Sequence, residues 1–183
     1  MGQHYARIAF TPAVQAEQEQ LGSRMLFARV AAEGRDDSLL STREASFIHA
    51  RDSFYMATVS ETGWPYLQHR GGPPGFLRVL DARTLAFADF SGNRQHVTIG
   101  NLARNDRAAL FLMDYANRHR LKLLGHARVV RNDPALLARL TPAGAERIAE
   151  SAMVITVAGF EWNCPQHITP RFTAEEWADL GRG

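Results

Sequence analysis

The sequence predicts a mainly β protein of the α+β class, in which antiparallel strands form a closed or nearly closed barrel with flanking helices. Three observations predict it. About seven strand-like segments follow residue 53. Short polar breaks separate most of them, which favours antiparallel pairing over the crossover helices of a doubly wound sheet. Closing this sheet into a barrel would remove exposed edges, which an open sheet of this size would leave.

Helices are expected near the start of the chain. Few strand-forming residues occur from Pro12 to Ala32, and Leu21, Met25 and Ala28 fall at helical spacing. A further helix is expected to begin at the capping box 41–44, whose sequence is STRE.

Strand-like segments fill the middle of the chain. Gly63 supplies a turn between the first two, and Gly125, inside a later one, indicates a bulge or a barrel corner. The segments are, in order, SFYMATVS, WPYLQHR, FLRVL, TLAFADF, RAALFLMDY, RLKLLGHARVV and AMVITVAGFEW.

Two more helix starts lie near the C-terminus. Asp133 and Pro134 are suited to a cap and a first-turn proline. Thr173 is expected to cap a short final helix with Glu176 as its capping-box partner, and the sequence places Phe172 so that it can contact Trp177.

Length and composition indicate one soluble domain over residues 1–183, with 45% hydrophobic and 22% charged residues. We expect a helical N-terminal extension over residues 1–40, followed by the barrel and a C-terminal helix over residues 41–183. Cys164 is the single cysteine, so no intrachain disulfide is expected and a reducing, cytoplasmic location fits. No signal peptide or membrane-length apolar run is evident, so no membrane association is expected.

The charge pattern argues against nucleic-acid binding. The net charge is +2, and Lys122 is the single lysine among 21 basic residues. The basic residues are scattered and often stand beside acidic ones, as in AEGRDD and RNDRA. A nucleic-acid interface would instead gather them on one face.

The segment 89–105, DFSGNRQHVTIGNLARN, predicts an anion site. A strand ends at Phe90, and an amphipathic helix is expected to begin near Arg94 with Asn93 as its N-cap. Free N–H groups at such a helix start, beside these side chains, suit a phosphate dianion. An ordinary capped helix with a solvated arginine is the alternative.

The stretch 64–79, WPYLQHRGGPPGFLRV, joins two cationic side chains to a loop rich in glycine and proline. Glycines at 71, 72 and 75 would let a flat group approach the backbone, and Pro73 and Pro74 would keep the loop stiff. These features suit a planar heteroaromatic ring with a phosphate tail. A rigid surface loop with solvated cations is the alternative.

The segment 161–172, EWNCPQHITPRF, follows the last strand at the expected mouth of the barrel. Asn163, Gln166 and His167 can donate hydrogen bonds to carbonyl and ring-nitrogen atoms. The alternative is a loop whose polar groups satisfy their own backbone.

Several other chemistries are excluded by missing motifs. The chain has no P-loop, no Gly-x-Gly-x-x-Gly, no Gly-x-Ser-x-Gly and no His-Glu-x-x-His. With one cysteine and seven dispersed histidines, no metal site is expected.

Taken together, these segments resemble the pyridoxamine 5′-phosphate oxidase-like, FMN-binding split-barrel family. The resemblance rests on FYMATVSETGWPYLQHRGG, TLAFADFSGNRQ, GNLARNDRAALFLMDY and RLKLLGHARVV, between about Phe47 and Val130, and extends more loosely to Arg171. It implies an antiparallel split β-barrel of six strands with flanking helices. It also implies a homodimer with FMN at the subunit interface, in clefts lined by both chains.

The resemblance further implies which residues bind the cofactor. Those expected to hold its phosphate are Asn93, Arg94 and Gln95. Those expected along the isoalloxazine and ribityl groups are Gln68, His69 and Arg70, with close approach at Gly71 and Gly72. Those expected to close over the ring from the neighbouring chain are Asn163, Gln166 and His167.

The expected function is that of an FMN-binding flavoprotein oxidoreductase, with a small-molecule substrate or electron donor that the sequence does not name. Members that oxidise pyridoxamine phosphate carry Arg-x-Val-Leu-Leu-Lys where this chain has QHRGGPPG, and a lysine where it has Gln95. Pyridoxamine phosphate is therefore not the expected substrate, and no catalytic residue is assigned. The alternative is a non-catalytic protein that binds or senses a flavin, a deazaflavin or haem.

Overall fold

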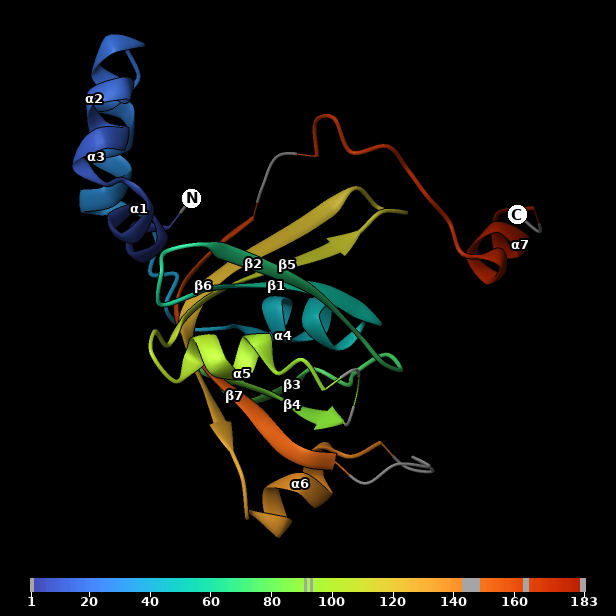
Figure 1. The fold of residues 1–183 in the computed structure, drawn as a ribbon. Helices are drawn as coiled ribbons and strands as arrows, with labels where there is room; N and C mark the ends of the chain where they lie inside the picture. Colours follow the sequence, from blue (N-terminus) through green and yellow to red (C-terminus); the bar gives the residue numbers. More distant parts are fainter. Residues whose placement is uncertain (1, 91, 93, 143–148, 163–164, 182–183) are drawn as a thin grey trace.

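Antiparallel strands form one seven-stranded sheet in the order β2-β1-β5-β6-β7-β4-β3 (Figure 1). The computed structural model describes residues 2–90, 92, 94–142, 149–162 and 165–181. The strand number agrees with the residue pattern and exceeds by one the six implied by the family resemblance. The strands are β1 (Ser53–Val59), β2 (Pro65–Gly71), β3 (Arg78–Asp81), β4 (Thr84–Phe90), β5 (Arg107–Asp114), β6 (His119–Val130) and β7 (Ala149–Trp162).

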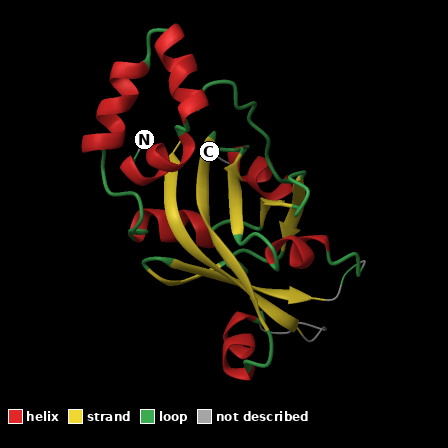
Figure 2. Cartoon of the chain, turned by 60° about the vertical axis from the view of Figure 1, so that its left-hand side comes forward, coloured by secondary structure: helices red, strands yellow, loops and turns green. Residues whose placement is uncertain are grey.

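Helices flank this curved sheet (Figure 2), which makes the fold the mainly β, α+β split barrel that the sequence predicts. The helices are α1 (Gln3–Ala9), α2 (Pro12–Gln20), α3 (Arg24–Glu33), α4 (Thr42–His49), α5 (Val97–Leu102), α6 (Pro134–Leu140) and α7 (Ala174–Leu180). The predicted capping boxes of α4 and α7 are both present, and the Asp133 side chain caps α6.

The core lies inside the curve of the sheet. Alternate residues of β1 and β5 are buried there, as expected for strands with one face on a core. The rings of Phe54, Phe76 and Phe87 meet in this core, with centroids of the first two 5.6 Å apart. Strands β4 and β7 are buried on both faces, because α6 covers a second apolar cluster formed by Ala86, Ala88, Leu140, Ala149, Ala152 and Val154.

The glycine- and proline-rich loop crosses the split of the barrel. β2 and β3 are consecutive in the chain but stand at opposite ends of the sheet order, so residues 72–77 must connect the two edges. Gly75 has a φ of 83°, and the Phe76 N–H donates to the Pro73 carbonyl at 2.9 Å. A Cβ on Gly72 would lie 2.7 Å from Cγ of Phe76. The space that this glycine provides is thus filled by the protein's own aromatic ring.

The N-terminal region forms helices. The chain turns at Gly22, where φ is 75°, so the helical stretch expected over residues 12–32 consists of two helices, α2 and α3, which form a hairpin. Leu21 and Met25 are 77% and 88% exposed, so their spacing does not mark a buried stripe. The hairpin projects from the barrel, whereas α1 packs against β7 (Figure 1).

Gly125 forms the predicted bulge. The pairing of β6 with β7 shifts register between Leu124 and Gly125. A Cβ at this glycine would lie 2.4 Å from the backbone oxygen of Thr156, a distance that no side chain can occupy. The bulge therefore lets two long strands bend around the core with their backbones in close contact.

We predict that Gly125→Ala lowers the free energy of unfolding by about 1–3 kcal/mol, the usual cost of forcing extra atoms into a packed interior. Urea denaturation followed by circular dichroism measures it. Gly100→Ala is the matched control, because beyond its chain neighbours and its own helix backbone the added Cβ in α5 meets nothing within 4 Å. There the substitution should be neutral or stabilise the protein. Equal effects at both positions would contradict the proposed steric role.

Candidate functional site

A cleft of about 230 Å³ lies between β2, the end of β4 and the residues before α5. It brings four of the predicted site residues together: Gln68 and Arg70 from β2, and Arg94 and Gln95 from the segment before α5. The further lining residues are Tyr66, Asp89, Phe90, Gly92, His96, Val97, Thr98, Ile99 and Glu150. The two stretches singled out in the sequence therefore share one site.

Strand alternation explains which β2 residues face this cleft. Tyr66, Gln68 and Arg70 are half-buried, and the Leu67 and His69 between them are exposed. The Tyr66 hydroxyl donates a hydrogen bond to Oε1 of Gln68. This bond orients the Gln68 amide within the cleft.

The start of α5 is not where the sequence predicts it. The helix begins at Val97, with His96 at the N-cap, rather than near Arg94 with Asn93 as the cap. Asn93 lies outside the described residues. Arg94 and His96 have φ of 59° and 52°, a left-handed conformation that costs a non-glycine residue free energy and delays the regular helix. Such conformations concentrate at functional sites.

Helix α5 is fixed to the barrel beneath the cleft by a buried hydrogen bond. Asn101 donates from Nδ2 to Oγ1 of Thr58 at 3.0 Å, and both residues are buried. Each polar group thereby satisfies the other, because an unpaired amide or hydroxyl would be costly at this depth. The contact sets the position of α5 relative to β1.

Arg70 is held in place by three residues from two elements, β4 and α5. Its Nη1 lies 3.2 Å from Oδ1 of Asp89 in β4, and its Nη2 donates to Oγ1 of Thr98 in α5 at 3.1 Å. Its guanidinium carbon also lies 5.7 Å from the centre of the Phe87 ring. The side chain is only 21% exposed. It therefore presents a largely fixed positive charge at the cleft.

Asp89 carries the most unusual carboxyl group of the site. Burial raises its pKa above the ordinary 3.8, and Glu150 adds to this rise, whereas Arg70 and His96 oppose it. The pairing of β4 with β7 shifts register between Asp89 and Phe90, opposite Glu150. A bulge of this kind redirects side chains beside a site.

A second chamber of about 220 Å³ adjoins the cleft and shares Arg70, Asp89 and Phe90 with it. The remaining predicted residues of β2 and its loop, His69, Gly71 and Gly72, line this chamber instead of the cleft. Its other walls are Pro73, Phe76, Phe87, Ala88, Leu140 and Pro142. The site thus has a polar compartment and a more aromatic one, with Arg70 between them.

The predicted tail residues are not brought to either chamber within one chain. Gln166 and His167 follow β7 and are exposed, and neither lines the cleft or its neighbour. Asn163 lies outside the described residues. The tail passes the barrel at Tyr115, whose ring centre lies 5.0 Å from the guanidinium carbon of Arg171. A contribution of this tail to a neighbouring chain stays a prediction.

Sequence reasoning missed five polar lining residues, namely Tyr66, Asp89, His96, Thr98 and Glu150. Tyr66 could have been found, because it precedes Gln68 by two positions and so shares its face of the strand. Asp89 and Thr98 lie within the predicted anion segment 89–105, but nothing local shows that they contact Arg70. Glu150 has no local signal, since it reaches the site through β4–β7 pairing across about 60 residues of sequence.

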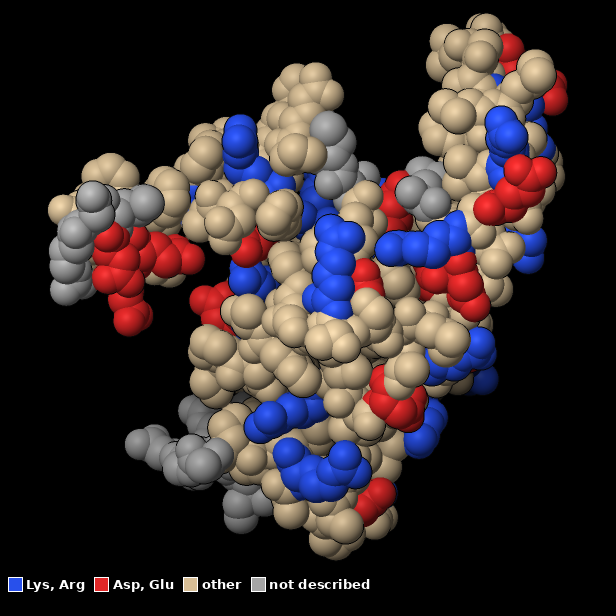
Figure 3. Space-filling model, turned by 180° about the vertical axis from the view of Figure 1, so that it is seen from behind, with Lys and Arg blue, Asp and Glu red and all other residues tan. Residues whose placement is uncertain are grey.

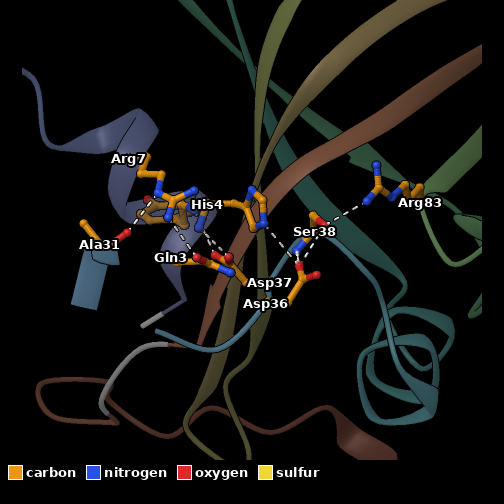
Figure 4. A network of polar contacts seen from close by, with 9 residues as sticks. Gln3, His4, Arg7, Ala31, Asp36, Asp37, Ser38 and Arg83 are labelled. Atoms are coloured by element: carbon orange, nitrogen blue, oxygen red, sulfur yellow. Dashed lines mark hydrogen bonds and ion pairs between the residues drawn. The ribbon is translucent and has the colours of Figure 1, made fainter. Parts of the chain in front are cut away.

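A separate polar cluster fastens α1 to the barrel (Figure 4). Among the described residues, His4, Asp36 and Asp37 place metal-ligand atoms within 4.8 Å of one another. The two carboxylate oxygens of Asp37 accept the backbone N–H groups of His4 and Tyr5 at 2.7 and 2.9 Å. Asp37 therefore caps the first turn of α1 from another segment, which accounts for this buried carboxylate without a metal. The expected absence of a metal site stays a prediction.

Comparison with known proteins defines the family. The family model for pyridoxamine 5′-phosphate oxidase matches residues 40–179. The chain therefore belongs to the pyridoxamine 5′-phosphate oxidase family, as its sequence resemblance indicates. None of the curated proteins searched matches the chain.

Solved structures with the same fold are distant in sequence. The HupZ protein of Group A Streptococcus is 16% identical, with a TM-score of 0.56 over 73% of this chain and 100% of that chain. A putative pyridoxamine 5′-phosphate oxidase from Lactobacillus delbrueckii is 19% identical, with a TM-score of 0.55 over 69% and 96%. An FMN-binding protein from Syntrophomonas wolfei is 11% identical, with a TM-score of 0.51 over 83% and 95%. At these identities the likeness shows the shared fold.

Two further observations concern possible partners. No helix among the described residues is long and apolar enough to cross a membrane. On the face shown in Figure 3, basic side chains are interspersed with acidic and uncharged ones. This distribution agrees with the expectation that the protein does not bind nucleic acid, which stays a prediction.

Proposed function

We propose that the protein is an FMN-binding flavoprotein oxidoreductase with an unassigned small-molecule substrate or electron donor. The observation that carries the proposal is the convergence of Gln68, Arg70, Arg94 and Gln95 in one cleft. Family membership and the FMN-binding protein of the same fold support it. A cytoplasmic location, where the single cysteine would stay reduced, fits this function.

The residues present fit a phosphate-tailed ring. Arg94 and the fixed guanidinium of Arg70 supply positive charge, and Gln68 and Gln95 supply amides, all in the polar cleft. Arginine is well suited to phosphate because its planar group offers several donors in a fixed geometry. The adjoining chamber, with the rings of Phe76 and Phe87 and the backbone of Gly71, offers apolar surface for a flat ring.

A bound flavin would supply the hydride or electron transfer, and the chain would supply position and electrostatics. Arg70 lies where both chambers meet, so it can contact the phosphate tail or the polar edge of a ring. His69 is held beside Tyr55, with ring centroids 5.7 Å apart, on the side of the aromatic chamber. No residue has to act as a covalent catalyst.

We further propose a homodimer formed through the outer face of β1, β2, β5 and β6. Outward positions of these strands carry apolar residues, which is unusual for a face in contact with water. A groove of about 440 Å³ opens on this face and is lined by Tyr5, Tyr55, Ala57, Leu67, Ala109, Leu110, Phe111, Tyr115, Lys122, Leu123 and Leu124.

A second copy of the chain is the occupant that fits this groove. The family resemblance implies a homodimer, and the tail with Gln166 and His167 leaves the barrel beside Tyr115, at the edge of the same face. A tail that misses its own cleft would be placed to reach the cleft of a partner. The site would then be complete only in the dimer.

The first prediction is that the purified protein carries FMN. It should show the visible absorption bands of an oxidised flavin and release FMN on denaturation.

Arg94→Ala should weaken FMN binding about tenfold to hundredfold, because a hydrogen bond to a charged group contributes that much to affinity. Flavin fluorescence titration measures the change. Arg128→Ala, an exposed arginine on β6 outside the cleft, should bind FMN normally. A colourless protein that ignores added FMN would refute the proposal.

The second prediction separates an enzyme from a flavin carrier. With FMN bound, NADH or NADPH in air should drive steady consumption of oxygen or of an added dye. Oxygen-electrode or dye-absorbance measurements record it. A bound flavin, deazaflavin or haem that never turns over would instead support the non-catalytic alternative, and the claim of oxidoreductase activity would be withdrawn.

The third prediction is that Leu67→Asp separates the dimer into monomers of 20.4 kDa and loses FMN with it, because a charge cannot be buried unpaired in an apolar interface. Light scattering after size-exclusion chromatography measures the mass. Leu26→Asp is a matched control, since Leu26 and Leu67 are both 64% exposed in the isolated chain. A wild-type monomer, or equal effects of the two substitutions, would argue against this interface.

A further inference from the structure

The polar cleft contains two carboxyl groups that a phosphate site does not require. Asp89 comes from β4, and Glu150 comes from β7 at the register shift opposite it. Both would repel a phosphate in the same cleft. Their presence beside Arg70 and Arg94 needs an explanation that the binding of a phosphate alone does not give.

Of the two carboxyl groups, Asp89 is the one that contacts Arg70. Asp89 is 17% exposed and holds Nη1 of Arg70 at 3.2 Å, while Thr98 accepts from Nη2 at 3.1 Å. These contacts come from β4 and α5 and converge on a side chain of β2, so Arg70 is fixed before any ligand arrives. Glu150 is exposed and lines the cleft wall.

We propose that Asp89 is a positioning residue, which holds the Arg70 guanidinium between the two chambers and yields part of it to the phosphate of the incoming ligand. The proposal rests on the proposed function, because FMN is the ligand that would bring the phosphate. Holding a long cationic side chain in advance reduces the entropy that ligand binding would otherwise cost. When Arg70 is shared with the phosphate in this way, the charge around Asp89 changes, and with it the protonation of Asp89.

The charges around Asp89 determine how phosphate binding should depend on pH. Arg70 from β2 and His96 before α5 favour the ionised carboxylate, whereas burial and Glu150 from β7 disfavour it and raise its pKa. Arg94 also lines the cleft, and Thr98 on α5 is neutral. A phosphate that shares Arg70 adds negative charge, so it favours the protonated form of Asp89 still more. Affinity for the phosphate should therefore fall as pH rises through the pKa of Asp89, on the side above its ordinary 3.8.

Two substitutions at Asp89 separate positioning from charge. Asp89→Asn keeps an oxygen that can accept from Arg70 and removes the negative charge. Asp89→Ala removes both. We expect Asp89→Asn to bind FMN at least as tightly as the wild type near pH 8 and with a shallower pH profile. Asp89→Ala should bind about tenfold more weakly than Asp89→Asn. Titration of flavin fluorescence from about pH 4, near the ordinary carboxyl pKa, up to about pH 8.5 measures both effects.

The matched control is Glu150→Gln, which removes a carboxylate from the same cleft without touching the Arg70 contacts described above. It should not weaken FMN binding. If Asp89→Ala does not fold, Thr98→Val replaces it, because it removes the other acceptor of Arg70 and should also weaken binding. Identical affinities and pH profiles in the wild type and both Asp89 variants would overturn the proposal.

A readout without FMN distinguishes this proposal from the proposed function. Nitrogen-15 NMR of the ligand-free protein reports how freely the Arg70 guanidinium rotates. Hindered rotation in the wild type and in Glu150→Gln, with free rotation in Asp89→Ala, is the expected result. If this pattern of rotation is found and the wild-type protein binds no FMN, the positioning role stands and the proposed flavin function fails. Equal rotation in all three proteins would overturn the positioning role whatever the protein binds.

Discussion

The two edges of the sheet, β2 and β3, do not meet as neighbours in the strand order, and most features of the protein depend on this constraint. The chain must cross from one edge to the other within residues 72–77, which requires a stiff and sharply turned loop. Phe76 fills the space beside Gly72 and packs against Phe54, so the crossing loop is anchored in the aromatic core. The split that remains is where α5 and the candidate site lie.

The electrostatics of the site follow from this position. Arg70 stands on an edge strand, so its side chain can reach across the split to Asp89 on β4 and Thr98 on α5. A guanidinium fixed by such contacts is both a wall between two chambers and a link between separate parts of the barrel. The proposed binding role and the structural contacts across the split would therefore use the same side chain, and a change in one is expected to affect the other.

The opposite face of the same strands has a different character. Inward residues of β1 and β5 complete the core, but their outward neighbours are also apolar and form an open groove. A sheet that is apolar on both faces is stable in water only when each face is covered. In this chain α6 covers one such region, over β4 and β7. A second subunit would cover the other in the proposed homodimer.

The sequence by itself determined the strand segments and several of the helix ends. The strand segments, the capping boxes at Ser41 and Thr173, the cap at Asp133 and the bulge at Gly125 follow from residues within a few positions of one another. Family membership also followed from ordered motifs. Helical spacing in residues 12–32 predicted helix there, but it did not show that the chain turns back at Gly22 or that Leu21 and Met25 are exposed.

Only the tertiary structure decided how the site is assembled. Glu150 enters it through a register shift with β4, and the start of α5 is delayed by left-handed residues at Arg94 and His96. Likewise, Gly72 makes room for Phe76, where the sequence suggested room for a ligand. These features arise from contacts between segments far apart in the chain, and local spacing carries no information about such contacts.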